Sequence, residues 1–236
     1  MSQPKELSIY LYHVEKTGGR STARSIMSGL LETSGIPPQK ATTLAHLIAE
    51  GETGGQGKEI FTQLTGADFR AGHVALHQFP IQEGWINVTQ FREPMARIMS
   101  YYRMLRAGEN SPAWRDSIGV NLPRSWEQFA TVVPLKILMR QLFMFSNHLD
   151  VTEALANIEK IDHVLFHIPG VYEDGIRALG ENLIGVPFKP IHHGPSPCPS
   201  ITPKELLADE KACNIIRERA EQEFELWEAL NPPEPK

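Results

Sequence analysis

A lysine, two glycines and several hydroxyl groups follow the first strand that the sequence predicts. The β-rich run 7–14 stops shortly before the glycines, and a helical pattern resumes at 21–33. Glycines let the backbone turn with its N–H groups facing inward, and the start of a helix offers unpaired N–H donors and a positive dipole end. We therefore predict an anion site at this turn. Its expected contacts are Lys16, Thr17, Gly18, Gly19, Arg20, Ser21 and Thr22.

The order of these residues argues against a loop for nucleoside triphosphates. In that loop, G-x-x-x-x-G-K-[ST], the lysine follows the glycines and a magnesium-binding hydroxyl stands next to it. Here Lys16 precedes Gly18 and Gly19, and no stretch of the chain matches that pattern. We therefore expect a phosphate-bearing ligand that needs no metal.

A second anion motif follows another predicted strand, 85–92. This strand ends in Arg92, where a magnesium enzyme often carries an aspartate, and the helix after it carries Arg97 and Ser100. A guanidinium offers a planar fork to a phosphate, and a hydroxyl can fill a remaining acceptor. Because the carboxyl ends of parallel strands converge on one crevice, we expect Lys16 and Arg92 to share a pocket. A structural ion pair is at least as good an interpretation of Arg97.

Together the motifs resemble those of sulfotransferases that use 3′-phosphoadenosine 5′-phosphosulfate, particularly the branch of the heparan sulfate 2-O- and 6-O-sulfotransferases. Residues 13–21 resemble the H-x-P-K-T-G-G-T-S loop of that family, with Glu15 and Arg20 replacing the usual proline and threonine. Residues 87–102 resemble its (V/L)-R-D-P-x-x-R-x-x-S-x-Y segment. The resemblance implies that Arg92 and Ser100 bind the 3′-phosphate of the co-substrate.

The resemblance also suggests a catalytic base. Gly72-His73-Val74 is similar to the G-H-V segment that carries the catalytic histidine of the 2-O branch, and histidine is a suitable base for an acceptor hydroxyl. We therefore predict that His73 accepts the proton while Lys16 stabilises charge on the leaving oxygen. A hydrogen-bonded structural histidine is the alternative. The family also has a cofactor-contacting loop before its last helix, which makes Ser196 a weaker candidate contact.

The predicted elements alternate between strands and helices. Strands are expected at 7–14, 69–77, 85–92 and 162–168, so that His73 and His77 share one strand face. Helices are expected at 21–33, 39–50, 94–106, 125–147 with a break at Pro134, 151–160, 171–184 and 202–230. Residues 107–124 are expected to form a loop that acts as a lid or binds the acceptor.

This order predicts an α/β fold with a mainly parallel central sheet flanked by helices. The resemblance implies that the fold is of the P-loop-like, three-layer type. Most charges of the last helix are expected to face solvent. We expect residues 1–236 to form a single sulfotransferase domain.

The amino-acid composition limits the classes of partner and ligand that we expect the protein to bind. With a net charge of −5, the chain has no broad basic field for a nucleic acid or a highly sulfated glycan. It shows no signal peptide, no run near the roughly 18 apolar residues of a membrane span, and only two cysteines. His192 and His193 lack the spacing of usual metal ligands, so we predict no metal site. We expect a cytoplasmic, bacterial enzyme whose acceptor is a small molecule or a carbohydrate, with a homodimer as one candidate assembly.

Two alternatives from other classes remain open. A small-molecule or nucleoside kinase would also use a phosphate loop, but it should require Mg²⁺ and bind ATP. A non-catalytic nucleotide-binding module would keep Lys16 and Arg92 but show no turnover, and His73 would then be structural. Magnesium dependence separates the first from a sulfotransferase, and acceptor-dependent product release separates the second.

Overall fold

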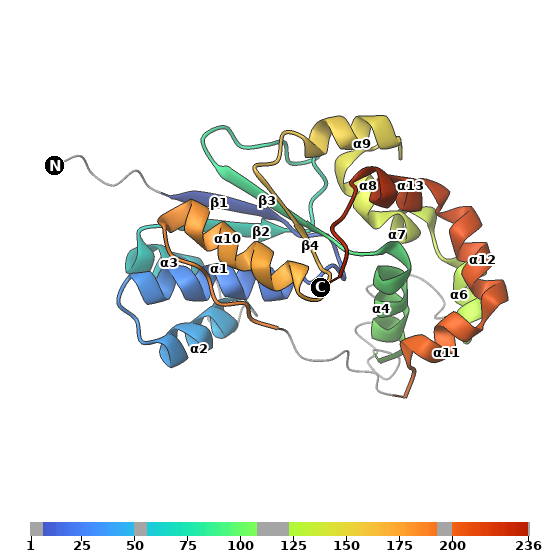
Figure 1. Cartoon of the computed structure of the whole chain (residues 1–236), viewed down its shortest axis with the longest axis horizontal. Coiled ribbons are helices and arrows are strands. Elements are labelled where there is room, and N and C mark those ends of the chain that lie inside the picture. The colour runs from blue at the N-terminus through green and yellow to red at the C-terminus, as the bar shows by residue number, and fades with distance from the viewer. Residues whose placement is uncertain (1–6, 50–55, 108–122, 193–199, 236) are drawn as a thin grey trace.

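The computed structural model describes residues 7–49, 56–107, 123–192 and 200–235. Its four strands run parallel in one sheet, in the order β2-β1-β3-β4. The strands are β1 (Ser8–Tyr12), β2 (Asp68–Gly72), β3 (Ile86–Phe91) and β4 (His163–Phe166). Helices flank this sheet, so the predicted three-layer α/β fold with a parallel central sheet is confirmed (Figure 1).

One face of the sheet is covered by helices from the first half of the chain together with α10. Ile9 and Leu11 of β1 point into this layer and are fully buried. The helices that pack there are α1 (Gly19–Thr33), α2 (Pro38–Ala49), α3 (Gly57–Thr65) and α10 (Val171–Ile184). Figure 1 shows α1 and α10 side by side along the sheet. Apolar residues at alternate positions of β1 thus form one half of the core.

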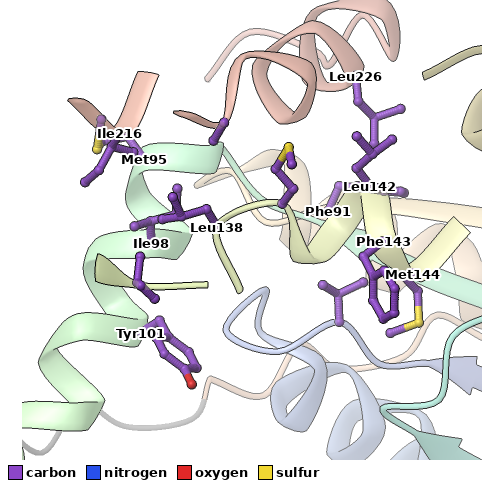
Figure 2. Packing of buried hydrophobic residues seen from close by; sticks show 14 of the residues in the cluster. Phe91, Met95, Ile98, Tyr101, Leu138, Leu142, Phe143, Met144, Ile216 and Leu226 are labelled. Atoms are coloured by element: carbon purple, nitrogen blue, oxygen red, sulfur yellow. The ribbon is translucent and has the colours of Figure 1, made fainter. Parts of the chain in front are cut away.

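The intervening positions of β1 face a second, larger cluster. Tyr10 and Tyr12 pack there with Phe91, so β1 is buried on both faces, as expected for a parallel strand. The helices that contribute are α4 (Pro94–Ala107), α6 (Trp126–Val132), α7 (Leu135–Leu138), α8 (Arg140–Phe145), α9 (Val151–Ile158), α11 (Pro203–Ala208), α12 (Glu210–Arg219) and α13 (Glu221–Ala229). In Figure 2, Ile98 of α4 lies beside Leu138, and Leu142 of α8 lies beside Leu226 of α13.

The strand predicted at 69–77 is shorter than expected. β2 ends at Gly72, and the chain then turns away from the sheet so that the N–H of Leu76 donates to the Met144 carbonyl at 2.8 Å. His73 and His77 are therefore not on a strand, and the prediction that they share one strand face is wrong. Burial of Leu76 against α8 competes successfully with continuation of the ladder.

Two predicted helices are divided. The break at Pro134 is confirmed, and a further break at Met139 separates α7 from α8. The helix predicted at 202–230 is three helices, with breaks at Asp209 and Ala220. Asp209 caps the start of α12 by accepting the Ala212 N–H at 3.0 Å, a signal that the sequence carried but that we did not use.

The remaining predicted helices are confirmed to within two residues at each end, whereas α3 was not predicted. Most of the loop predicted at 107–124 and all of 193–199 lie outside the described residues. In the part of the chain that the structure describes, no helix is both long and apolar enough to cross a membrane.

Candidate functional site

The lysine loop, which we define as residues 13–18, connects β1 to α1 at the carboxyl edge of the sheet. Lys16 has a φ of 66° and Gly18 a φ of 97°, so the backbone is left-handed at both positions. The Gly18 carbonyl accepts the N–H groups of Ser21 at 2.9 Å and Thr22 at 3.2 Å, which begins α1. The loop therefore leads directly into the amino-terminal end of a 15-residue helix. The free N–H groups and the helix dipole favour an anion there.

Two of the predicted hydroxyl contacts are used inside the protein. Thr17 is fully buried and its hydroxyl donates to the Val14 carbonyl at 2.8 Å. The Thr22 hydroxyl donates to the side-chain oxygen of Gln90 on β3. Ser21 is also buried, in the first turn of α1. The loop therefore depends mainly on its backbone N–H groups and on nearby cationic side chains to attract an anion.

Close contacts require a glycine both at Gly18, the last residue of the lysine loop, and at Gly19, the first residue of α1. A Cβ at Gly18 would lie 2.6 Å from Nδ1 of His167 and 2.9 Å from Nε2 of Gln90. A Cβ at Gly19 would lie 1.9 Å from Cδ2 of His13, which is shorter than any real contact. The rings of His13 and His167 thus press against the loop, and only residues without a Cβ allow this approach.

Replacement of Gly18 by alanine should destabilise the fold by more than the same change at Gly35. Both glycines have a left-handed φ, 97° and 87°, so each alanine should cost roughly 1–2 kcal/mol of backbone strain. Gly35 has open space around its Cα, whereas Gly18 faces His167 and Gln90, so Gly18→Ala should cost about 1–3 kcal/mol more. Urea unfolding of both variants measures the difference. Equal losses would contradict the tight packing of the loop.

Arg92 follows β3 and reaches the lysine loop. Its Nη1 donates to the Lys16 carbonyl at 3.2 Å. The strand order makes this contact possible, because the chain moves from β1 to β2 on one side and then to β3 on the other, so the switch point lies between β1 and β3. The structure thus brings Lys16 and Arg92 together at the place where ligands of open α/β sheets bind.

A buried hydrogen-bond network holds the backbone of Arg92 in place. The Arg92 backbone N–H donates to Oε1 of Gln141 at 2.8 Å, and Nε2 of Gln141 donates to Oε1 of Glu223 at 3.1 Å. Glu223 also forms an ion pair with Arg97 at 3.2 Å, and both side chains are fully buried. Of the two interpretations of Arg97, the structure therefore favours the structural ion pair. Glu223 is thus a buried exception to the prediction that most charges of the last helix face solvent.

Cationic groups gather around the loop. Burial lowers the pKa of Lys16, and the nearby charges of Arg92, Arg20 and Arg103 lower it further, against the opposing effect of Glu15. Burial also lowers the pKa of Arg92, although Glu93 opposes the shift. The lowered pKa values mean that both burial and the repulsion between neighbouring cations disfavour the charged forms of Lys16 and Arg92. An anion placed among them would relieve this repulsion, which makes the cluster a suitable phosphate site.

His73 lies directly beyond β2 and against the lysine loop. Its Nδ1 is 2.6 Å from the carbonyl oxygen of His13, and the two imidazole rings are 4.2 Å apart. A carbonyl oxygen can only accept a hydrogen bond, so Nδ1 carries the proton and Nε2 keeps its lone pair. His73 is exposed, and Nε2 can therefore take a proton from a molecule bound beside the loop.

His13 is held neutral beneath His73. Burial, followed by the charges of His73, Arg20 and Lys16, lowers the pKa of His13 to about 3. A neutral ring at this position adds no further positive charge to the site. The His13 ring therefore fills the space between Gly19 and the His73 ring.

Several site residues were missed by the sequence analysis. His167 directly follows β4, and burial together with the charge of Arg92 lowers its pKa to about 4. Its Nδ1 lies 3.2 Å from Nε2 of Gln90 on β3. Position at the carboxyl end of a strand could have indicated both residues. Arg140 and Gln141, which open α8, carried no local signal, because only the fold brings that helix to the site.

Two further predicted contacts are Ser100 and Ser196. Ser100 lies on the second turn of α4 and is partly exposed. Its role as a phosphate contact stays a prediction. Ser196 lies outside the described residues.

Comparisons with known proteins do not assign a family. No protein-family model matches the chain, and no curated protein matches it. Any functional conclusion therefore rests on the residues and their arrangement.

Proposed function

We propose that this protein is a sulfotransferase that moves the sulfuryl group of 3′-phosphoadenosine 5′-phosphosulfate to a hydroxyl group of a small molecule or a carbohydrate. One observation carries the proposal. The Arg92 guanidinium contacts the Lys16 carbonyl at the switch point of the sheet, and His73 lies against the same loop. Two cationic residues, Lys16 and Arg92, and a histidine, His73, thus lie close together, and each follows a different strand.

These donors fit a nucleotide that carries phosphate groups at both the 3′ and the 5′ position of its ribose. Lys16 and the amino-terminal end of α1 would hold the phosphosulfate end, and Arg92 with Ser100 would hold the 3′-phosphate. Thr17 and Thr22 support the loop instead of contacting the ligand, because their hydroxyl protons are used inside the protein.

The chain's own residues perform two tasks in the proposed reaction. Nε2 of His73 takes the proton from the acceptor hydroxyl as its oxygen forms a bond to sulfur. The bond from sulfur to the bridging oxygen of the phosphate breaks, and adenosine 3′,5′-bisphosphate leaves with the electron pair. Lys16 and the loop amides stabilise the charge that grows on that bridging oxygen.

Calorimetric titrations with adenosine 3′,5′-bisphosphate in EDTA test the proposal, with ADP and ATP as control ligands and a repeat of the ATP titration in Mg²⁺. We expect the bisphosphate to bind most tightly, and we expect Arg92→Ala to weaken it about 10- to 100-fold, because a hydrogen bond to a charged group is worth roughly 1.5–3 kcal/mol. Arg177→Ala is the matched control, because Arg177 pairs with Asp174 on the surface of α10. This variant should bind like the unmodified protein.

Two results would overturn the proposal. Equal or weaker binding of the bisphosphate than of ADP would remove the 3′-phosphate site. Tight ATP binding only in the presence of Mg²⁺ would favour the kinase alternative. If the bisphosphate binds tightly, release of bisphosphate from the phosphosulfate is then followed with a panel of alcohols, phenols and monosaccharides.

A further inference from the structure

Arg140 connects two segments that the proposed reaction needs. It is the first residue of α8, and its Nη2 donates to the backbone carbonyl of His73 at 3.1 Å. Its Nε lies 3.9 Å from Oε2 of Glu15, the residue before Lys16. Glu15 follows β1 and His73 follows β2, so a single guanidinium spans the ends of two adjacent strands.

The segment that carries His73 has few other restraints. β2 is an edge strand, and its ladder with β1 ends at the pair of Tyr12 and Gly72. The His73 side chain is exposed, so burial does not fix it. The hydrogen bond from Nδ1 to the His13 carbonyl orients the ring, but it requires that the backbone at His73 already lies beside the loop.

Helix α8 supplies the missing restraints on this segment. Arg140 holds the carbonyl of His73, and the Met144 carbonyl holds the N–H of Leu76 at 2.8 Å. The Arg140 guanidinium also lies over the ring of Phe143, 5.7 Å from its centroid. The arginine is therefore supported on one side by an aromatic ring and on the other by Glu15, so that its fork keeps one orientation.

We propose that Arg140 is a positioning residue that holds the backbone of His73 against the lysine loop, so that Nε2 of His73 faces the bound acceptor. This inference rests on the proposed function for its effect on turnover. Its effect on the ring of His73 does not depend on that function. Arg140 acts through the His73 carbonyl and the Glu15 carboxylate, and it transfers no proton itself.

The test compares Arg140→Gln, Arg140→Lys and the control Arg177→Gln. Imidazole nitrogen NMR spectra of the ¹⁵N-labelled full chain report which ring nitrogen carries the proton, and a His73→Asn spectrum identifies the His73 signals. We expect the proton on Nδ1 in the unmodified protein and in Arg177→Gln. Arg140→Gln should give a mixture of both tautomers, and Arg140→Lys should lie between, because one ammonium group cannot satisfy both partners.

Turnover provides the second measurement, using the acceptor found in the panel. Arg140→Gln should lower kcat roughly 10- to 100-fold, because small misplacement of a catalytic group is costly, while the Kd of adenosine 3′,5′-bisphosphate stays unchanged. A higher KM for the acceptor at unchanged kcat would overturn the proposal in favour of direct acceptor binding. An unchanged His73 spectrum in Arg140→Gln would also overturn it. If the bisphosphate does not bind, the sulfotransferase proposal fails, and the NMR spectra still decide the role of Arg140.

Discussion

Replacing His73 by asparagine should lower turnover by about 100- to 10,000-fold, the usual contribution of a general base. The asparagine amide can occupy the position of Nδ1 and donate to the His13 carbonyl, which His73 contacts at 2.6 Å. It has no group at the position of Nε2. The substitution therefore removes the proton acceptor and keeps the hydrogen bond that joins the segment to the loop. Steady-state release of adenosine 3′,5′-bisphosphate measures the loss.

Two controls show what this result means. Calorimetry should show that His73→Asn binds the bisphosphate like the unmodified protein, because Lys16 and Arg92 are unchanged. His77→Ala is the matched histidine control, since the His77 ring contacts Phe143 and not the loop. It should keep its activity within about twofold. Full activity in His73→Asn would reject the base and leave His73 with the structural role that the sequence also allowed.

The sequence predicted the residues that line the anion site better than the residues that hold them in place. Lys16, Gly18 and Arg92 were found because each belongs to a segment that follows the carboxyl end of a strand, where topology alone brings side chains to one edge. Arg140 and Gln141 come from a helix inside a longer segment, and their contacts with His73 and Arg92 span 67 and 49 positions. No local pattern encodes such contacts, because they depend on how α8 packs against the sheet.

The fold shows the same division between local and distant causes. Alternation of apolar residues and the glycines after β1 predicted the strands and the helix that follows, because these signals lie within a few residues. The end of β2 was predicted wrongly at His77. There a contact between Leu76 and Met144, 68 positions apart, determines where the strand stops. Similarly, Glu223 lies inside the core, although Glu221 and Glu225, two positions away on either side, are exposed.

Glu223 is the anchor of the support behind Arg92. Its carboxylate accepts the N–H of Leu142 at 2.8 Å and two N–H groups of Gln141, at 3.2 and 3.1 Å, and it pairs with Arg97. Burial alone raises the pKa of Glu223, and the charge of Arg97 and these N–H donors oppose the shift. The carboxylate is thus surrounded by N–H donors, of which Arg97 also donates to the backbone carbonyls of Ile137 and Leu138.

Replacing Glu223 by alanine should destabilise the protein by about 3–5 kcal/mol, because Arg97 is left as a buried charge without its partner. This is a large part of the roughly 5–15 kcal/mol that keeps a domain folded. Urea unfolding measures the loss, and Glu221→Ala, an exposed acid at the start of the same helix, should change stability by less than about 0.5 kcal/mol. A loss that small at Glu223 would contradict the network.

A second variant separates the lost charge from the lost volume. Arg97→Met combined with Glu223→Leu removes both charges and keeps apolar bulk, so it should be more stable than Glu223→Ala alone. It still deprives Gln141 of its acceptor, and Gln141 holds the Arg92 backbone at 2.8 Å. We therefore expect the double variant to fold and yet to bind adenosine 3′,5′-bisphosphate more weakly than the unmodified protein. Unchanged binding would show that Arg92 needs no support from α13, and the link between the last helix and the anion site would then be rejected.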